Sequence, residues 1–163
     1  MIILDASTLI LLAKTDLLPI LTKKNELHIS FTVKQEALSK PDRYDAQMIG
    51  SLIDKKQLHV THDEPTHSIR RLCQDFNLDR GEAASLLLAR KNKAPIGTDD
   101  GAAIKAAKIM GIRFFTAIHV LIELNQKGRV PKELALAKVD LLGQVGRYSQ
   151  FILDDARSRI KGR

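Results

Sequence analysis

Short apolar runs alternate with longer helical patterns along most of this chain, and this alternation restricts the possible fold more than any other feature. The runs expected as strands are residues 1–5, 27–31, 58–60, 94–97 and 112–115. The helical patterns fall at residues 7–14, 17–22, 32–38, 42–56, 68–76, 81–91 and 101–110. This order predicts an α/β fold with helices flanking a mainly parallel sheet of four or five strands. After the last strand the pattern is helical throughout, with helices expected at 117–126, 131–142 and 144–159.

Length and composition favour one domain in a reducing compartment. A chain of 163 residues without a linker-like segment is expected to fold as a single domain, residues 1–163. The lone cysteine, Cys73, excludes an internal disulfide. No apolar run approaches the roughly 20 residues that a membrane span needs, and the start lacks the basic segment of a signal peptide. We therefore expect a cytoplasmic protein with no membrane association.

The net charge of +7 favours an anionic partner such as nucleic acid. Aromatic residues make up only 4% of the chain and tryptophan is absent, so no stacking platform for bases is expected. Contact with backbone phosphates is the favoured mode of binding.

Acidic residues follow two of the expected strands directly. Asp5 ends the first apolar run, and the pair Asp99 and Asp100 follows the run at 94–97. In open α/β sheets the ligand crevice lies outside the carboxyl ends of the strands. These carboxylates are therefore expected to meet at one edge of the sheet.

Each of these acids also has a purely structural interpretation. Asp5 could cap the helix that follows, although Ser7 is an equally good cap. Asp79 and Glu82 have the spacing of a capping box, and Asp100 could cap the next helix. Singly, none of them identifies a site.

Glu36 differs, because Thr32 and Gln35 already have the spacing of a capping box and leave Glu36 without a capping role. Two acids at strand ends and two on flanking helices together favour a metal site over four unrelated caps. Crowded carboxylates raise one another's proton affinity unless a cation compensates them. Mg²⁺ and Mn²⁺ prefer such oxygen ligands.

The chain resembles a known family at these residues. Segments 4–14, 81–89 and 98–100, together with Glu36, are similar to the motifs of the PIN domain. The likeness extends over nearly the whole chain and is greatest to the subgroup with additional C-terminal helices, here about residues 129–163. The resemblance implies a three-layer fold with a central, mainly parallel sheet.

Several functional expectations follow from this resemblance. PIN domains are Mg²⁺- or Mn²⁺-dependent ribonucleases, and many are the toxin half of VapC-like toxin–antitoxin pairs. The implied reaction is hydrolysis of RNA phosphodiester bonds, in which one or two metal ions activate water and offset charge on the leaving oxygen. The implied partners are RNA, an antitoxin protein and a second copy of the chain.

The resemblance also assigns roles to individual residues. The implied metal ligands are Asp5, Glu82, Asp99 and Asp100, with Asp100 as the better match of the last two. Glu36 is implied as a further catalytic carboxylate, and Ser7 and Thr98 as supporting hydroxyl residues. The subgroup often carries an arginine shortly after the paired acids, where this chain has only Lys105.

Other parts of the chain are candidates for RNA contact and for dimer formation. The candidate RNA-binding residues are Lys105, Arg157, Arg159, Lys161 and Arg163. The candidate dimer surface consists of Leu9, Ile10, Leu12, Leu17, Leu18 and Leu21, which could equally belong to the ordinary core.

Two alternatives compete with this interpretation. A PIN-fold module that binds RNA or protein without turnover would share the same motifs. Zinc binding by His59, His62 and His67 is disfavoured, because their spacing fits no closed structural site and no cysteine lies nearby.

Overall fold

The computed structural model describes residues 1–162 and contains one five-stranded sheet in the order β3-β2-β1-β4-β5. The strands are β1 (Ile2–Leu4), β2 (Leu27–Ser30), β3 (Leu58–Thr61), β4 (Ile96–Gly97) and β5 (Phe114–Phe115). All four neighbouring pairs are parallel, as the sequence predicted. β4 and β5 are shorter than the apolar runs that contain them.

The order in which the chain adds strands to the sheet reverses next to β1. After β1 the chain adds β2 and β3 on one side, and it then returns to add β4 and β5 on the other. The carboxyl ends of β1 and β4 are therefore neighbours at a topological switch point, where ligands bind in sheets of this kind.

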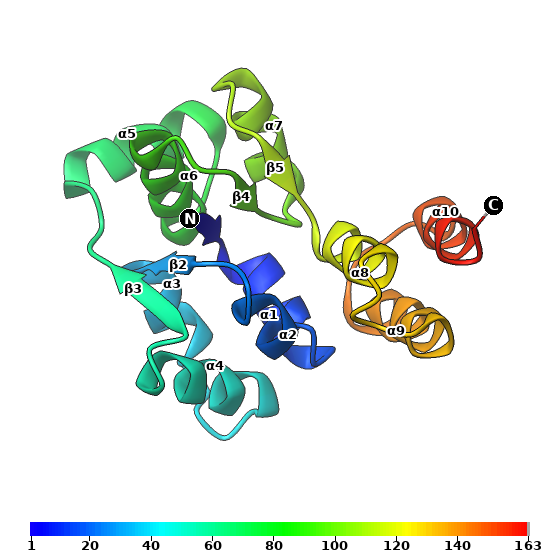
Figure 1. Ribbon diagram of the computed structural model, residues 1–163. Coiled ribbons are helices and arrows are strands. Elements are labelled where there is room, and N and C mark those ends of the chain that lie inside the picture. The colour runs from blue at the N-terminus through cyan, green and yellow to red at the C-terminus, as the bar shows by residue number, and fades with distance from the viewer. Residues whose placement is uncertain (163) are drawn as a thin grey trace.

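Helices cover both faces of the sheet and give the expected three layers (Figure 1). Below the sheet in that view lie α1 (Ala6–Lys14), α2 (Leu18–Thr22) and α4 (Tyr44–Asp54), and α3 (Phe31–Ala37) follows β2. Above it lie α5 (Thr66–Phe76), α6 (Arg80–Asn92) and α7 (Gly101–Ile109). Neighbouring strand residues point to opposite faces. Accordingly, the fully buried Ile3 packs in one apolar core and the fully buried Leu4 in the other.

The leucine-rich segment proposed as a dimer surface is part of the core instead. Leu9, Leu12, Leu17 and Leu18 are fully buried, Leu21 is nearly so, and Ile10 is half-buried. These side chains pack with strand residues and with helices on the same face of the sheet. The expectation that they offer free apolar surface is wrong, and the predicted dimer must use other residues.

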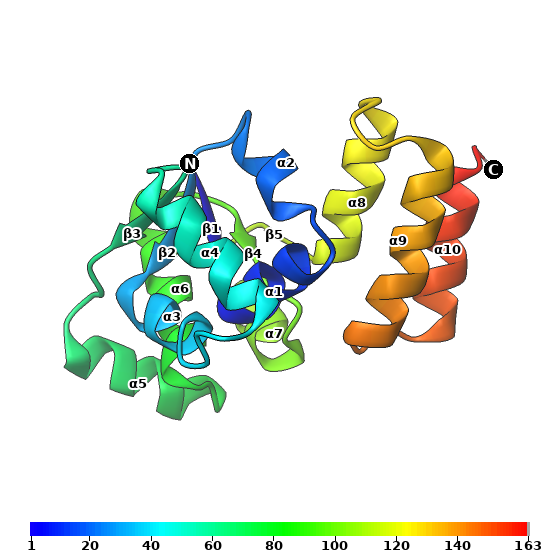
Figure 2. The same cartoon turned by 90° about the horizontal axis from the view of Figure 1, so that it is seen from below.

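Three helices end the described part of the chain and stand side by side beyond α1, and the last two of them form the C-terminal extension (Figure 2). The three helices are α8 (Ala117–Gln126), α9 (Lys132–Val145) and α10 (Gln150–Ile160). The buried Lys138 of α9 donates a 2.6 Å hydrogen bond to the carbonyl oxygen of Thr15 at the end of α1. A cation at the carboxyl end of a helix is favourably placed for the helix dipole, so this contact anchors the extension.

The predicted helix over residues 144–159 is confirmed only from Gln150 onward, because the chain turns between Gly146 and Ser149. Ser149 accepts a hydrogen bond from the backbone N–H of Ile152 and caps α10. The turn separates α9 from α10 and carries Tyr148. No helix within residues 1–162 is long and apolar enough to cross a membrane.

Candidate metal centre at the carboxyl edge of the sheet

Asp5 is the buried centre of the carboxyl edge, with only 1% of its surface exposed. Its Oδ1 accepts from the Ser7 hydroxyl at 2.6 Å and from the backbone N–H of Thr8 at 3.2 Å. Its Oδ2 accepts from the hydroxyl of Thr98, the residue that follows β4. Asp5 therefore caps α1 and also joins the ends of β1 and β4. Ser7 and Thr98 contact it as the sequence predicted.

The Asp99 carboxylate is held by hydrogen bonds from three other residues. Its Oδ2 accepts from the Thr8 hydroxyl at 2.5 Å and from the backbone N–H of Ala117 at 3.0 Å, while its Oδ1 accepts from the Tyr148 hydroxyl. Both oxygens are thus engaged by donors. Metal ligation by Asp99 stays a prediction, and the geometry favours Asp100 as the ligand of this pair.

Asp100 faces Glu82 across the edge of the sheet. The Asp100 carboxyl group is close enough to Glu82 to raise the pKa of Glu82. Oδ1 of Asp100 is buried and has no hydrogen-bond partner within the described part of the chain. Asp100 precedes α7 but makes no side-chain cap. A buried polar atom without a partner is costly and requires an explanation.

Glu82 has a structural role in addition to its place in the site. Its Oε2 accepts from the backbone N–H of Asp79 at 2.9 Å, and Asp79 accepts in return from the N–H of Glu82 at 2.8 Å. The capping box that the sequence suggested is therefore present at the start of α6. This box fixes the Glu82 backbone opposite Asp100.

Glu36 reaches the same edge from α3 because Gly81 leaves room for it. Oε2 of Glu36 lies 2.5 Å from the position that a Cβ atom on residue 81 would occupy. The predicted capping box of Thr32 and Gln35 is wrong, because Ser30 caps α3 through the N–H of Val33. Thr32 instead donates to Asp63 at 2.5 Å.

Burial and mutual repulsion raise the pKa values of three of these acids. Burial raises the pKa of Asp5 to about 6, against hydrogen bonds from Ser7 and Thr98. Burial, together with the charges of Asp79 and Asp100, raises the pKa of Glu82 to about 7. The pKa of Glu36 is raised first by burial and then by Asp79 and Asp5. Groups that repel one another in this way are stabilised in their charged form by a nearby cation.

The available carboxylate oxygens suit a hard divalent cation, although they do not surround a single point in this structure. In residues 1–162 no three Asp, Glu, His or Cys side chains lie close enough together to hold an ion. The available donors are carboxylate oxygens, the ligands that Mg²⁺ and Mn²⁺ prefer. The unpartnered oxygen of Asp100 beside Glu82 is the position that a cation would satisfy.

Three groups that bind Asp99 at this edge were not among the predicted site residues. Thr8 and the N–H of Ala117 bind Asp99, and Tyr148 reaches it from the α9–α10 turn. Thr8 lies within the motif around Asp5, so its hydroxyl could have been included. No local signal marks Tyr148, which is 49 residues from Asp99.

The predicted RNA-binding residues occupy two regions. Lys105 is exposed on α7, one turn beyond Asp100. Arg157 pairs with Asp140 and Asp154, and Arg159 pairs with Asp155, so their charges are compensated within the extension. Lys161 follows α10 and is exposed, while Arg163 lies outside the described residues. RNA contact by these groups stays a prediction.

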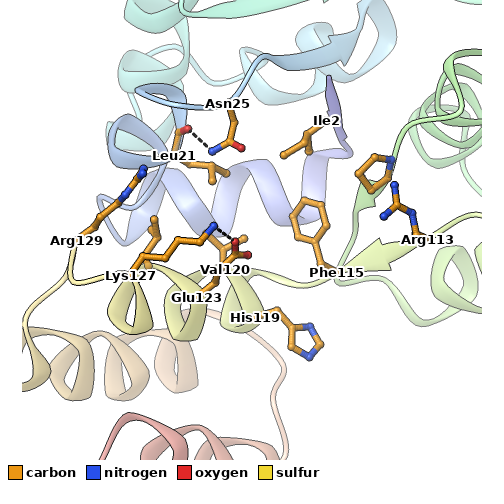
Figure 3. A pocket seen from close by; sticks show the side chains of 12 residues that line it. Ile2, Leu21, Asn25, Arg113, Phe115, His119, Val120, Glu123, Lys127 and Arg129 are labelled. Atoms are coloured by element: carbon orange, nitrogen blue, oxygen red, sulfur yellow. Dashed lines mark hydrogen bonds and ion pairs between the residues drawn. The ribbon is translucent and has the colours of Figure 1, made fainter.

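A cavity of about 360 Å³ lies at the opposite edge of the sheet (Figure 3). Its lining includes Ile2, Asn25 and Arg113, which lie at or before the amino ends of strands, and Lys127 and Arg129 after α8. None of the site carboxylates lines it. The chemistry of the carboxyl edge is therefore independent of this cavity.

The fold and the carboxylates define a parallel α/β protein with an acidic site at its topological switch point. The chain belongs to the PIN domain family, whose sequence profile matches residues 1–161. PIN domains are generally nucleases and usually use divalent metal ions. Comparison with curated protein sequences gave no significant match.

Solved structures support the fold. The crystal structure of PAE2754 from Pyrobaculum aerophilum matches with a TM-score of 0.57 and 20% identity, covering 76% of this chain and 88% of PAE2754. The PilT N-terminus domain protein SSO1118 from Sulfolobus solfataricus P2 matches with a TM-score of 0.53 and 15% identity, covering 75% of this chain and 91% of that protein. At these identities the two structures establish the shared fold alone.

Replacing Gly81 by alanine should displace Glu36 without destabilising the protein. The new Cβ would meet the mobile end of the Glu36 side chain, while alanine gains up to about 1 kcal/mol of helix preference over glycine. We expect Gly81→Ala to keep or raise the melting temperature and to reduce its rise on addition of Mn²⁺. Gly101→Ala, where nothing lies within 4 Å of the new Cβ, is the matched control. Equal Mn²⁺ responses of the two variants would contradict a role for Glu36 in the site.

The metal-free protein should lose stability as the pH rises from about 5 to about 8. The carboxyl groups of Asp5 and Glu82 keep their protons up to about pH 6 and about pH 7 in the folded state. The unfolded chain releases the same protons near pH 4, so the folded state binds more protons across this window and stability falls with rising pH. Melting temperatures of the wild type and of an Asp5→Asn, Glu82→Gln double variant measure the effect. An equally steep fall in both proteins would assign the pH dependence to other groups.

Proposed function

We propose that this protein is a metal-dependent ribonuclease that hydrolyses RNA phosphodiester bonds with Mg²⁺ or Mn²⁺. The observation that carries the proposal is the buried, unpartnered Oδ1 of Asp100 beside the Glu82 carboxyl group. A buried polar atom without a partner costs stability unless a ligand satisfies it. Family membership supports the nuclease class.

The cation would be held by Asp5, Glu82 and Asp100. When bound, it supplies activation of a water molecule and offsets the charge that develops on the leaving oxygen. Ser7 and Thr98 hold Asp5 in one orientation through hydrogen bonds to its two oxygens. The carboxylate of Glu36 lies at the amino end of α6, where its raised pKa suits it to accept a proton from the attacking water.

RNA is the substrate in this proposal because the chain carries a net charge of +7 and because the family resemblance includes RNA cleavage. Lys105 lies one turn beyond Asp100, within the helix that begins at the site. A cation at that distance can neutralise a phosphate next to the scissile one.

The proposal extends to a biological role as the toxin of a toxin–antitoxin pair. That role rests on the family resemblance, and it implies a protein inhibitor and a homodimer as partners. The alternative is a PIN-fold module that binds RNA at this edge without cleaving it.

Asp5→Asn and Asp100→Asn should each reduce RNA cleavage by at least about a hundredfold, since loss of metal-ion stabilisation removes several kcal/mol from the transition state. The assay follows cleavage of a labelled single-stranded RNA with Mg²⁺, Mn²⁺ or a chelator. Asp54→Asn is the control, because this exposed residue ends α4 before the amino end of β3. Folding is checked by circular dichroism.

Metal-independent cleavage, or full activity of repurified Asp5→Asn protein, would overturn the assignment. RNA binding without cleavage by the wild type would favour the binding module. The toxin role is tested with the same proteins in cells, where only the wild type and Asp54→Asn should arrest growth.

A further inference from the structure

Asp99 connects four segments of the chain at the carboxyl edge. Its carboxylate accepts from Thr8 of α1, from the N–H of Ala117 at the start of α8 and from Tyr148 in the α9–α10 turn. Its own N–H donates to Ser7 Oγ at 2.9 Å, and Ser7 in turn donates to Asp5. The residue next to the proposed ligand Asp100 is thus fixed from several directions.

Fixing Asp99 also fixes Asp100, because the two residues share the short link between β4 and α7. The N–H of Asp100 makes only a long contact of 3.3 Å to the Thr98 hydroxyl, and Oδ1 of Asp100 has no partner in residues 1–162. The orientation of Asp100 toward Glu82 therefore depends on what holds its neighbour. The carbonyl oxygen of Asp100 also accepts from the N–H of Ile104 at 2.9 Å, so Asp99 and the first turn of α7 share that restraint.

Tyr148 is the member of this group that the C-terminal extension provides. Its hydroxyl donates to Asp99 and accepts from the N–H of Ile118 at 3.2 Å, so both its donor and its acceptor capacity are used. The half-buried ring packs against the apolar core.

The α9–α10 turn is built around the tyrosine ring. A Cβ atom on Gly146 would lie 3.1 Å from the ring of Tyr148 and 2.9 Å from the carbonyl oxygen of Leu142. Only a residue without a side chain leaves space for the ring at this turn. Gly143 similarly lets Leu153 approach, since its Cβ would lie 2.9 Å from that side chain and α10 packs closely on α9.

We infer that Tyr148 is a positioning residue, and that the C-terminal extension completes the metal centre by holding Asp99 through the Tyr148 hydroxyl. The inference deepens the proposed function and rests on it for the reaction, but its effect on metal binding does not require turnover. The C-terminal extension then contributes to the metal site and is not only an additional helical bundle. Hydrogen-bond partners of this outer kind typically change metal affinity or activity about 10- to 100-fold when removed.

The test compares Tyr148→Phe with Tyr44→Phe. Tyr44 is the only other tyrosine of the chain, and its hydroxyl also donates to a carboxylate, that of Asp16. Both variants therefore lose one tyrosine–aspartate hydrogen bond. We expect Tyr148→Phe to weaken Mn²⁺ binding about tenfold or more, measured by electron paramagnetic resonance of free Mn²⁺, while Tyr44→Phe binds as the wild type does.

A second readout uses the metal-free protein. Amide hydrogen exchange at Asp99, Asp100 and Ala117 should speed up in Tyr148→Phe, while the amides of α10 keep their protection. A purely structural role would instead speed up exchange throughout α9 and α10. That pattern, or unchanged Mn²⁺ affinity, would overturn the inference.

A double-variant cycle tests whether Tyr148 acts through Asp99. In an Asp99→Ala background, Tyr148→Phe should have no further effect on Mn²⁺ affinity, because the acceptor is gone. Additive effects would contradict the proposed route. If Mn²⁺ binding depends on Tyr148 but the wild type cleaves no RNA, the inference stands and the proposed function fails. If the wild type cleaves RNA and Tyr148→Phe matches it in both Mn²⁺ affinity and turnover, the inference fails and the proposed function stands.

Discussion

The hydrogen bonds of the buried Asp5 carboxylate are the interaction on which the rest of this structure depends. They join the end of β1, the first turn of α1 and the residue that follows β4. The order in which the chain adds strands reverses between β1 and β4, so no direct connection between these two strands brings their ends together. Three donors offset part of the cost of burying a charge, but burial still raises the pKa of Asp5. The same residue thus stabilises the fold and leaves the carboxyl edge in need of positive charge.

The electrostatics of the site follow from this arrangement. Asp5, Glu36 and Glu82 come from three different elements, and desolvation together with neighbouring acids raises the pKa of each, although only Asp5 is fully buried. A protein selected only for stability would not retain this combination, since crowded carboxylates repel one another. A divalent cation reverses the balance, because the charges that repel one another all attract it. The arrangement is therefore best understood as a site that gains stability when its ligand binds.

Sequence reasoning reached the strand ends because local chemistry marks them. An aspartate directly after an apolar run identifies Asp5 and the Asp99–Asp100 pair without any knowledge of the strand order. The same reasoning failed where the outcome depends on contacts between residues that are far apart in the sequence. Ser30 and Thr32 are equally good caps by sequence, and the choice depends on Asp63, 31 residues from Thr32, which engages the Thr32 hydroxyl. Leu9 and Leu12 looked like free surface because nothing in the sequence shows which helices cover α1. Tyr148 was missed because its partner is distant in the chain and because Gly146 and Ser149 were not recognised as a turn.

The most direct test of the central claim, that the carboxylates gather around one hard cation, is anomalous diffraction from crystals soaked with Mn²⁺. The account predicts a manganese peak bonded to oxygens of Asp100, Glu82 and Asp5, with Asp99 still bound to Tyr148. Bond lengths of about 2.0 to 2.3 Å would identify direct ligation by carboxylates. A peak ligated by Asp99 instead of Asp100 would contradict the assigned geometry. A crystal at saturating Mn²⁺ without any peak at this edge would contradict the account as a whole.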